Sequence, residues 1–279
     1  MIETVLAHEA LIRLGAFLGL LAGVALWEVA APRRARNLPR RLRWPNNLGI
    51  VALNTLLVRA VFPVAAVGLA ATGEERGWGL LNLAPLPDAV KVVAAVLLLD
   101  LAIYLQHVMF HAVPALWRLH RLHHADVDFD VTTGARFHPI EMLLSMLIKF
   151  TVVAALGAPA LAVLIFEVQL NATAMFNHGN VRLPAALDRV LRLVVVTPDM
   201  HRVHHSVLPR ETNSNFGFNL PWWDRLLGTY RAQPDAGHVG MRIGLEHFRD
   251  PRDAWLDRLL VQPWRPETGA YTIGPRFES

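Results

Sequence analysis

The chain has 279 residues, of which 53% are hydrophobic, a formal charge of +4 at neutral pH, and no cysteine. A mean hydropathy of +0.33 is too high for an ordinary soluble domain and indicates one compact membrane-embedded unit. Without cysteine this chain forms no disulfide, thiolate metal site or iron–sulfur cluster, so nitrogen and oxygen must hold any metal. The basic residues lie beside apolar runs, which indicates topology signals and no nucleic-acid partner.

The first half of the chain predicts two membrane spans, at residues 11–31 and 48–71. Between them, residues 33–43 hold six arginines and no acid, which the positive-inside rule places in the cytoplasm. The mixed segment 73–88 is expected on the opposite side of the membrane. A third span, 89–110, then returns the chain to the cytoplasmic side.

Residues 140–176 form an apolar stretch that is too long for one crossing of a membrane. Gly157 and Pro159 interrupt it near the middle, which predicts two helices folded as a hairpin. After the hairpin, residues 184–196 have the pattern of a helix in the membrane interface. Thr197 then predicts the N-cap of a further helix, with proline at its first position.

Eight of the 13 histidines fall in three short clusters. Residues 107–111 read H-x-x-x-H, and residues 120–124 and 201–205 both read H-x-x-H-H. Side chains three and four positions apart share one face of a helix, so we expect each cluster to point into a single volume. Neutral imidazole binds Fe, Zn, Cu and Ni, and eight ligands exceed what one zinc ion takes, so the clusters imply two metal ions. The candidate ligands are His107, His111, His120, His123, His124, His201, His204 and His205.

Four acidic residues near these clusters have open interpretations. Asp100 lies on one helical stripe with the first histidines, where a hydrogen bond to a metal ligand and a purely structural role are equally compatible with the pattern. Asp126, Asp128 and Asp130 alternate as on an extended segment. A calcium loop is the alternative for these three, although the Gly and Glu of an EF-hand are missing.

The histidine clusters, together with RFHP at 136–139, FNH at 176–178 and NFGFNLPWWDRLLGTY at 215–230, resemble the fatty acid hydroxylase / sterol desaturase superfamily. These proteins are membrane-bound histidine-box di-iron oxygenases. The resemblance covers about residues 100–230. It implies that His178 is a further metal ligand and that His138 occupies a recurrent position. In some relatives a second histidine lies four residues before the position of His178, where this chain has Ala174, so one metal is a ligand short unless His138 supplies it.

Together, pattern and resemblance predict an all-α fold, a multi-pass transmembrane helical bundle of about four or five membrane helices in two hairpins, with a cytoplasmic helical cap carrying the dimetal site. We expect a single unit over 1–279, consisting of an N-terminal membrane region (1–99), the histidine-box core (100–230) and a cytoplasmic tail (231–279). The closing segment 215–230 is expected to form a tight, packed turn rather than to take part in the chemistry.

The resemblance implies a di-iron centre of two Fe ions that uses O2 to hydroxylate or desaturate a membrane lipid, such as a sterol or fatty acyl chain. No haem domain, dinucleotide fingerprint or thiol cluster is visible, so electrons must come from a separate reductase, ferredoxin or cytochrome b5-like donor. Two alternatives remain open. A zinc-dependent membrane hydrolase needs a glutamate beside the first histidine, where this chain has Val108. A metal transporter would place its ligands at mid-membrane.

Overall fold

The computed structural model describes residues 2–266, 269 and 271–273, and the regular elements in this part of the chain are helices. The all-α expectation is therefore confirmed. Five helical stretches are long and apolar enough to cross a membrane, as expected of an integral membrane protein. They are α2 (Glu9–Ala30), α3 (Arg40–Val61) at the start of the apolar run Arg40–Leu83, α6 (Asp88–Ala112), α8 (Pro139–Leu156) and α9 (Ala160–Asn177).

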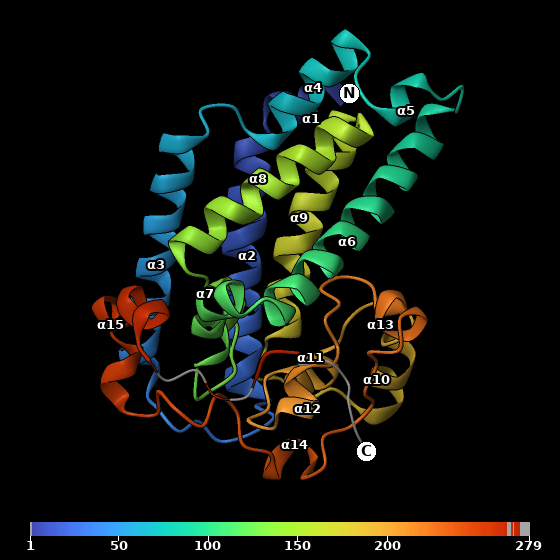
Figure 1. Cartoon of the computed structure of the whole chain (residues 1–279). Helices are drawn as coiled ribbons and strands as arrows, with labels where there is room; N and C mark the ends of the chain where they lie inside the picture. Colours follow the sequence, from blue (N-terminus) through green and yellow to red (C-terminus); the bar gives the residue numbers. More distant parts are fainter. Residues whose placement is uncertain (1, 267–268, 270, 274–279) are drawn as a thin grey trace.

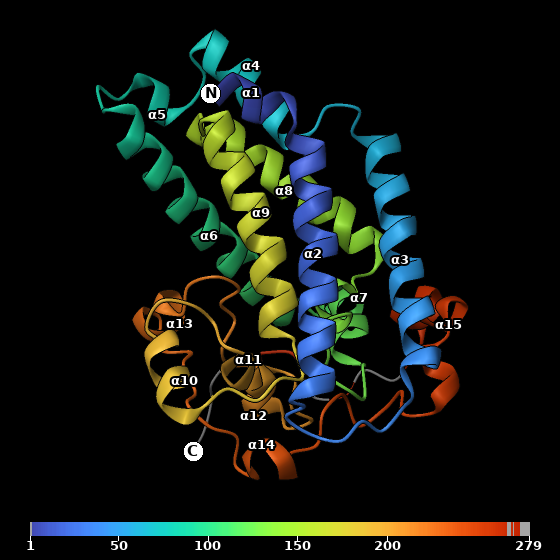
Figure 2. The same cartoon turned by 180° about the vertical axis from the view of Figure 1, so that it is seen from behind.

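Consecutive spans run in opposite directions, and the chain starts at the upper end of the bundle in Figure 1. The predicted hairpin of α8 and α9 is confirmed, because Gly157 adopts a left-handed φ of 61° at the end of α8 and Pro159 precedes α9. Seen from behind, α2 lies along α9 in the middle of the bundle (Figure 2), and these two helices pack together. The upper end is covered by α1 (Ile2–Ala7), α4 (Ala66–Arg76) and α5 (Leu80–Leu83).

The second span differs from the prediction of one helix over 48–71. Helix α3 begins earlier, at Arg40, and ends at Val61, while Ala66–Arg76 form the separate helix α4. Pro63 explains the break, because proline lacks a backbone N–H and disfavours helical geometry in the residue before it. Hydropathy continues across this proline, so hydropathy alone did not reveal the turn.

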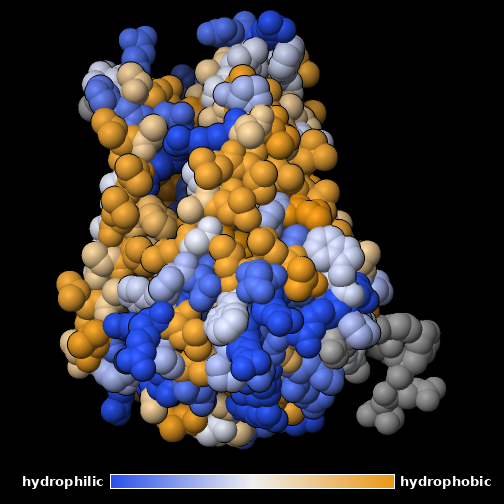
Figure 3. Space-filling view, turned by 90° about the vertical axis from the view of Figure 1, so that its left-hand side faces the viewer, coloured by the Kyte–Doolittle hydropathy of each residue, from blue (hydrophilic) through white to orange (hydrophobic). Residues whose placement is uncertain are grey.

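The lower end of the bundle carries short helices, and hydrophilic residues gather there, whereas apolar residues cover much of the sides (Figure 3). Thr197 caps one of these helices by accepting the N–H of Met200, as predicted. The predicted helix over 184–196 is shorter, spanning seven residues. In chain order the elements are α7 (Pro114–His124), η1 (Thr133–Ala135), α10 (Ala185–Leu191), α11 (Pro198–His204), α12 (Pro209–Thr212), α13 (Trp222–Leu226), α14 (Gly237–Gly240), η2 (Pro251–Ala254), α15 (Leu256–Val261) and η3 (Gln262–Trp264).

Candidate metal centre

Nine histidine rings converge at the lower end of the bundle, and each residue is at most 3% exposed. The last turns of α6 supply two of them and α7 supplies three. The residue after α9 supplies one, and α11 together with the residue that follows it supplies three. They are His107, His111, His120, His123, His124, His178, His201, His204 and His205. Segments up to about one hundred residues apart are therefore brought to one place.

The nine rings form two groups, in each of which one ring nitrogen per histidine lies within 4.8 Å of the others. The five-histidine cluster consists of His107, His111, His120, His124 and His204, and the four-histidine cluster consists of His123, His178, His201 and His205. The H-x-x-x-H pair of His107 and His111 points into one volume as expected, whereas the two H-x-x-H-H triplets do not. Neighbours on a helix point about 100° apart, so each H-x-x-H-H triplet divides between the two clusters.

The distances between ring nitrogens fit shared metal ions. His178 Nε2 lies 3.1 Å from the Nε2 atoms of three other rings, those of His123, His201 and His205. One ring nitrogen carries at most one hydrogen or one lone pair, so hydrogen bonds do not account for three such neighbours. Two nitrogens bound at about 2.1 Å to one ion are about 3.0 Å apart at right angles and about 3.4 Å apart at the tetrahedral angle. The observed spacing therefore fits a coordination number above four.

The five-histidine cluster has the same spacing. The Nε2 atoms of His107 and His120 are 3.1 Å apart, and so are those of His111 and His124. The Nε2 atom of His204 is buried and makes no hydrogen bond with the described residues. A buried polar atom without a partner is costly, and a metal ion would satisfy it.

In five of the rings the Nδ1 atom, on the side away from the cluster centre, faces an oxygen that accepts its hydrogen bond and so leaves Nε2 unprotonated. A ring that donates its Nδ1–H to an oxygen presents its Nε2 lone pair, which is the form that binds metal. Sequence reasoning did not identify these partners, although Glu141 lies only three residues after His138 of the RFHP segment. The bonds join His107 to Phe216 O (2.7 Å), His111 to Asn213 Oδ1 (3.1 Å), His120 to Glu141 Oε1 (2.6 Å), His178 to Ala174 O (2.7 Å) and His204 to Ser214 O (2.8 Å).

Glu141 is expected to position His120, so Glu141→Ala should weaken metal binding by about 10–100-fold, the usual cost of losing a partner of a metal-bound histidine. Glu141→Gln keeps a carbonyl acceptor and should recover part of this affinity. Competition with a chelator measures it, and Glu75→Ala, at an exposed position at the opposite end of the bundle, is the control. Equal affinities for Glu141→Ala and the unchanged protein would contradict this role.

The closing segment forms a hydrogen-bonded turn, in agreement with its predicted packing role. Asp224 accepts the backbone N–H groups of Phe216 and Gly217 at 2.8 and 2.9 Å. Asp100 on α6 accepts Asn219 Nδ2 at 2.7 Å and Trp223 Nε1 at 2.8 Å. Asp100 therefore stabilises the turn and does not hydrogen-bond a histidine itself. The turn positions the Phe216 carbonyl, which accepts a hydrogen bond from His107.

His138 lies outside both clusters. Its Nδ1 accepts the N–H of Ile140 as the N-cap of α8, and its Nε2 faces the carbonyl of Leu260 at 3.1 Å. Both ring nitrogens thus have partners away from the other nine histidines. The four-histidine cluster therefore has one histidine fewer than the five-histidine cluster.

The three alternating aspartates bind protein groups. Arg43 reaches both carboxylate oxygens of Asp126 (2.7 and 2.6 Å) and one of Asp130 (2.5 Å), and all three side chains are buried. Asp128 accepts the N–H groups of Asn37 and Leu38. Burial opposes ionisation of Asp126, but the nearby guanidinium groups outweigh it and hold its pKa at about 2. These contacts explain the acids without a calcium ion.

Burial, reinforced by the neighbouring imidazoles, lowers the pKa of His123, His124, His201, His204 and His205 well below the usual value. Burial likewise lowers the pKa of His178, to about 3. Neutral rings are ready to bind metal at pH 7.

The same shifts predict acid sensitivity of the metal-free protein. An unfolded histidine titrates near about 6.5, so below that pH the unfolded chain takes up protons that the folded chain refuses. Stability is therefore full above about pH 6.5 and falls as the pH drops towards the folded-state values. Unfolding midpoints of chelator-treated protein in detergent should decrease from pH 7 to pH 5, and a constant midpoint would contradict the neutral state of the rings.

A cavity of about 860 Å³ begins at the five-histidine cluster, where His107 and His120 line it, and extends between α2, α3, α8 and α9. Phe110, Phe137 and Phe218 surround its histidine end. Its volume is in the range of small-molecule binding sites.

Together, the membrane helices and the buried histidines define an integral membrane protein with a histidine-rich site suited to metal ions. Residues 92–229 match the fatty acid hydroxylase family. The chain belongs to this family, which confirms the resemblance drawn from its motifs.

Three curated relatives illustrate the range of the similarity. Ornithine lipid hydroxylase OlsE of Rhizobium tropici is 34% identical over 53% of this chain and 44% of its own length. Human (Homo sapiens) alkylglycerol monooxygenase is 26% identical over 56% of this chain and 34% of its own length, and cholesterol 25-hydroxylase of Rattus norvegicus is 28% identical over 51% and 47%. The matches thus span less than half the length of these relatives. No solved structure matches the chain.

Proposed function

We propose that this protein is an O2-dependent non-haem di-iron oxygenase that hydroxylates a membrane lipid. The observation that carries the proposal is the placement of nine buried histidines at one end of a cavity that runs between membrane helices. The relatives are named as hydroxylases and monooxygenases, which favours hydroxylation over desaturation.

In this proposal the five-histidine cluster holds one iron and the four-histidine cluster holds the other. His138 is left out of the ligand set because its ring nitrogens are engaged elsewhere. Iron, when bound, supplies the redox chemistry that activates O2 towards an unactivated C–H bond, which no amino-acid side chain provides.

The protein's own residues contribute positioning and exclusion of water. The hydrogen bonds that the rings donate to Glu141 and to backbone carbonyls orient them before any substrate binds. Because the histidines are at most 3% exposed, bulk water is kept from this end of the cavity. The phenylalanines that line this end give a hydrocarbon chain an apolar surface along which it can reach His107 and His120.

We further propose that the histidine end faces the cytoplasm, where a separate protein donates electrons. The arginine-rich segment lies at this end, since Arg33 pairs with Asp199 of α11 and Arg34 donates to Met241 O. An excess of arginine near membrane helices favours the cytoplasmic side. The chain itself offers histidine ligands but no cysteine for an iron–sulfur relay.

The alternatives are less well supported. A zinc hydrolase requires a four-coordinate ion with an open position, whereas five histidines form one cluster at spacings shorter than a tetrahedron gives. Glu141, the nearest candidate for a general base, is hydrogen-bonded to His120. A transporter would hold its ligands at mid-membrane, whereas these lie at one end of the bundle.

Two measurements on the full chain test the proposal. The purified protein should contain about two irons per chain, one for each histidine cluster. Lipid extracts from cells with and without expression should differ by lipids that have gained one oxygen atom. Zinc in a protein that hydrolyses lipids, or iron-loaded protein without any oxygenated lipid in the presence of O2 and reductant, would overturn the proposal.

A further inference from the structure

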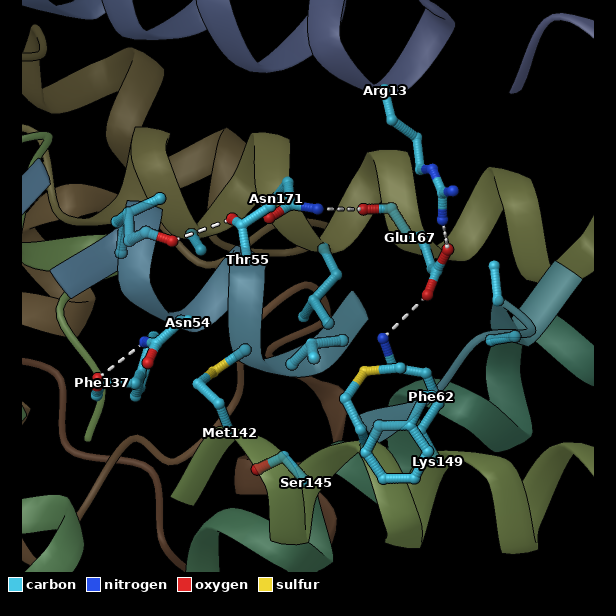
Figure 4. A pocket seen from close by; sticks show the side chains of 18 of the residues that line it. Arg13, Asn54, Thr55, Phe62, Phe137, Met142, Ser145, Lys149, Glu167 and Asn171 are labelled. Atoms are coloured by element: carbon cyan, nitrogen blue, oxygen red, sulfur yellow. Dashed lines mark hydrogen bonds and ion pairs between the residues drawn. The ribbon is translucent and has the colours of Figure 1, made fainter. Parts of the chain in front are cut away.

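The end of the cavity that lies away from the histidines is lined by charged side chains as well as apolar ones. Its lining there includes five charged side chains, which we call the charged end: Glu9, Arg13, Arg59, Lys149 and Glu167. Figure 4 shows Arg13 and Lys149 pointing to Glu167 from opposite sides. Arg13 Nη1 lies 2.5 Å from one carboxylate oxygen of Glu167, and Lys149 Nζ lies 2.9 Å from the other.

The charged end has more cationic than anionic groups. Three cations face two carboxylates, because Glu9 pairs with Arg13 at 3.2 Å and Glu167 is shared between two cations. Arg59 forms no ion pair with the described residues. Lys149 and Glu167 are largely buried, with side chains 13% and 7% exposed. The surplus positive charge lies on Arg59, which is exposed, so the charged end offers an incoming anion one cation that has no carboxylate partner among the described residues.

The two ends of the cavity are separated by an apolar stretch. Glu141, which contacts His120, and Lys149 lie eight residues apart on α8, or about 12 Å along the helix. Met142 and Met146 of α8 and Leu170 of α9 line the cavity between these levels. An apolar channel with a cationic end has the form that fits an amphiphile with an anionic head group.

At the histidine end of the cavity the polar atoms without partners among the described residues are hydrogen-bond acceptors, in contrast to the cations of the charged end. Asn54 is 6% exposed and donates its amide N–H to Phe137 O at 2.9 Å, which leaves its Oδ1 as an acceptor without a partner among the residues that the structure describes. Glu141 Oε2 is a second buried acceptor for which the described part of the chain offers no donor within hydrogen-bond distance. Both line the cavity. Hydrogen-bond acceptors repel an anion but bind an O–H group, so the anionic group belongs at the charged end.

The charged end is reached from the side of the bundle. Leu14 and Val64, which line this part of the cavity, are 54% and 52% exposed. In Figure 3 hydrophilic residues are visible inside a hollow in the upper part of the apolar surface. A lipid would therefore enter laterally from the membrane.

We propose that the charged end binds the anionic head group of a lipid, a carboxylate or a phosphate, beside Arg13, Arg59 and Lys149. The hydrocarbon chain then extends towards the histidines. Extended chain advances about 3.5 Å per three bonds, so the oxidised carbon lies no closer than roughly ten bonds from the head group. The last statement rests on the proposed hydroxylase function, whereas the binding site does not.

Binding of hexadecanoate, hexadecyl phosphate and neutral hexadecanol to the purified full chain tests the proposal. Lys149→Met removes one cation while keeping a long apolar side chain, and should weaken binding of an anionic probe about tenfold, the worth of a hydrogen bond to a charged group. Hexadecanol binding should change less than about twofold. Lys91→Met, on α6 and outside the cavity lining, is the matched control and should leave all three probes unaffected.

Glu167→Gln separates ligand binding from a purely structural ion pair. It frees both cations, so anionic probes should bind more tightly than to the unchanged protein, whereas a structural pair predicts no gain. If only hexadecyl phosphate responds to these substitutions, the head group is a phosphate; if only hexadecanoate does, it is a carboxylate. Equal behaviour of Lys149→Met and Lys91→Met, or an equal loss of hexadecanol binding, would overturn the proposal. Binding requires neither O2 nor turnover, so an inactive protein that passes this test refutes the oxygenase function alone.

Discussion

His123→Ala and His124→Ala are expected to remove different metal ions, although the two residues are adjacent in the chain. His124 belongs to the five-histidine cluster and His123 to the four-histidine cluster. Each substitution should reduce the iron content from about two to about one per chain, and should lower lipid hydroxylation by at least about 100-fold, because losing a ligand costs more than losing its hydrogen-bond partner. In a chelator titration His123→Ala should lose the iron of the four-histidine cluster to a weaker chelator than His124→Ala needs to lose that of the five-histidine cluster, since three histidines remain against four. Elemental analysis after chelator titration measures both effects.

His138→Ala is the informative control for these substitutions. His138 caps α8 and lies outside both clusters, so its replacement should leave the iron content unchanged. His8→Ala, at an exposed position near the start of the chain, should behave in the same way. Loss of one iron from His138→Ala would show that the nine-histidine assignment is wrong.

Hydropathy predicted five membrane spans, although not the bounds of the second, and helical spacing singled out eight of the nine clustered histidines, whereas His178 was identified only from the family resemblance. The turn at Pro63 was missed because apolar residues continue beyond it, while the Gly157–Pro159 hairpin was found because the stretch was too long for one span. The division of His123 and His124 between two clusters depends on how α7 and α11 pack, which spacing within one helix does not specify. Local patterns therefore predict which residues face a site, but not which residues they meet.

The partners of the histidines were harder to foresee for a similar reason. Asn213 and the carbonyls of Ser214 and Phe216 come from irregular segments whose path has no periodic signature. Arg43 was interpreted as a topology signal because a basic residue beside a membrane span looks the same in sequence whether it is solvated or paired. In the structure it is buried against Asp126 and Asp130.

Arg43→Met is expected to lower the free energy of unfolding by about 3–5 kcal/mol, the cost of breaking a buried ion pair by removing one partner. Asp130 would remain buried without its paired guanidinium, and Asp126 would keep only Arg136, at 3.7 Å; both aspartates lie within the segment that joins α7 and α8. The midpoint of thermal unfolding in detergent measures the effect. Arg41→Met removes an exposed arginine two residues away and should change the stability by less than about 0.5 kcal/mol.

The double substitution Arg43→Met with Asp126→Asn tests the physical cause of this loss. If the cost comes from an uncompensated buried carboxylate, neutralising Asp126 should recover part of the stability, so the two changes will not be additive. If the cost came only from the lost shape of the arginine side chain, the second change would destabilise the protein further, since the Asp126 side chain also accepts from Thr133 Oγ1. An additive double variant would therefore contradict the role of Arg43 as the counter-charge that holds the loop between α7 and α8 beside the histidines.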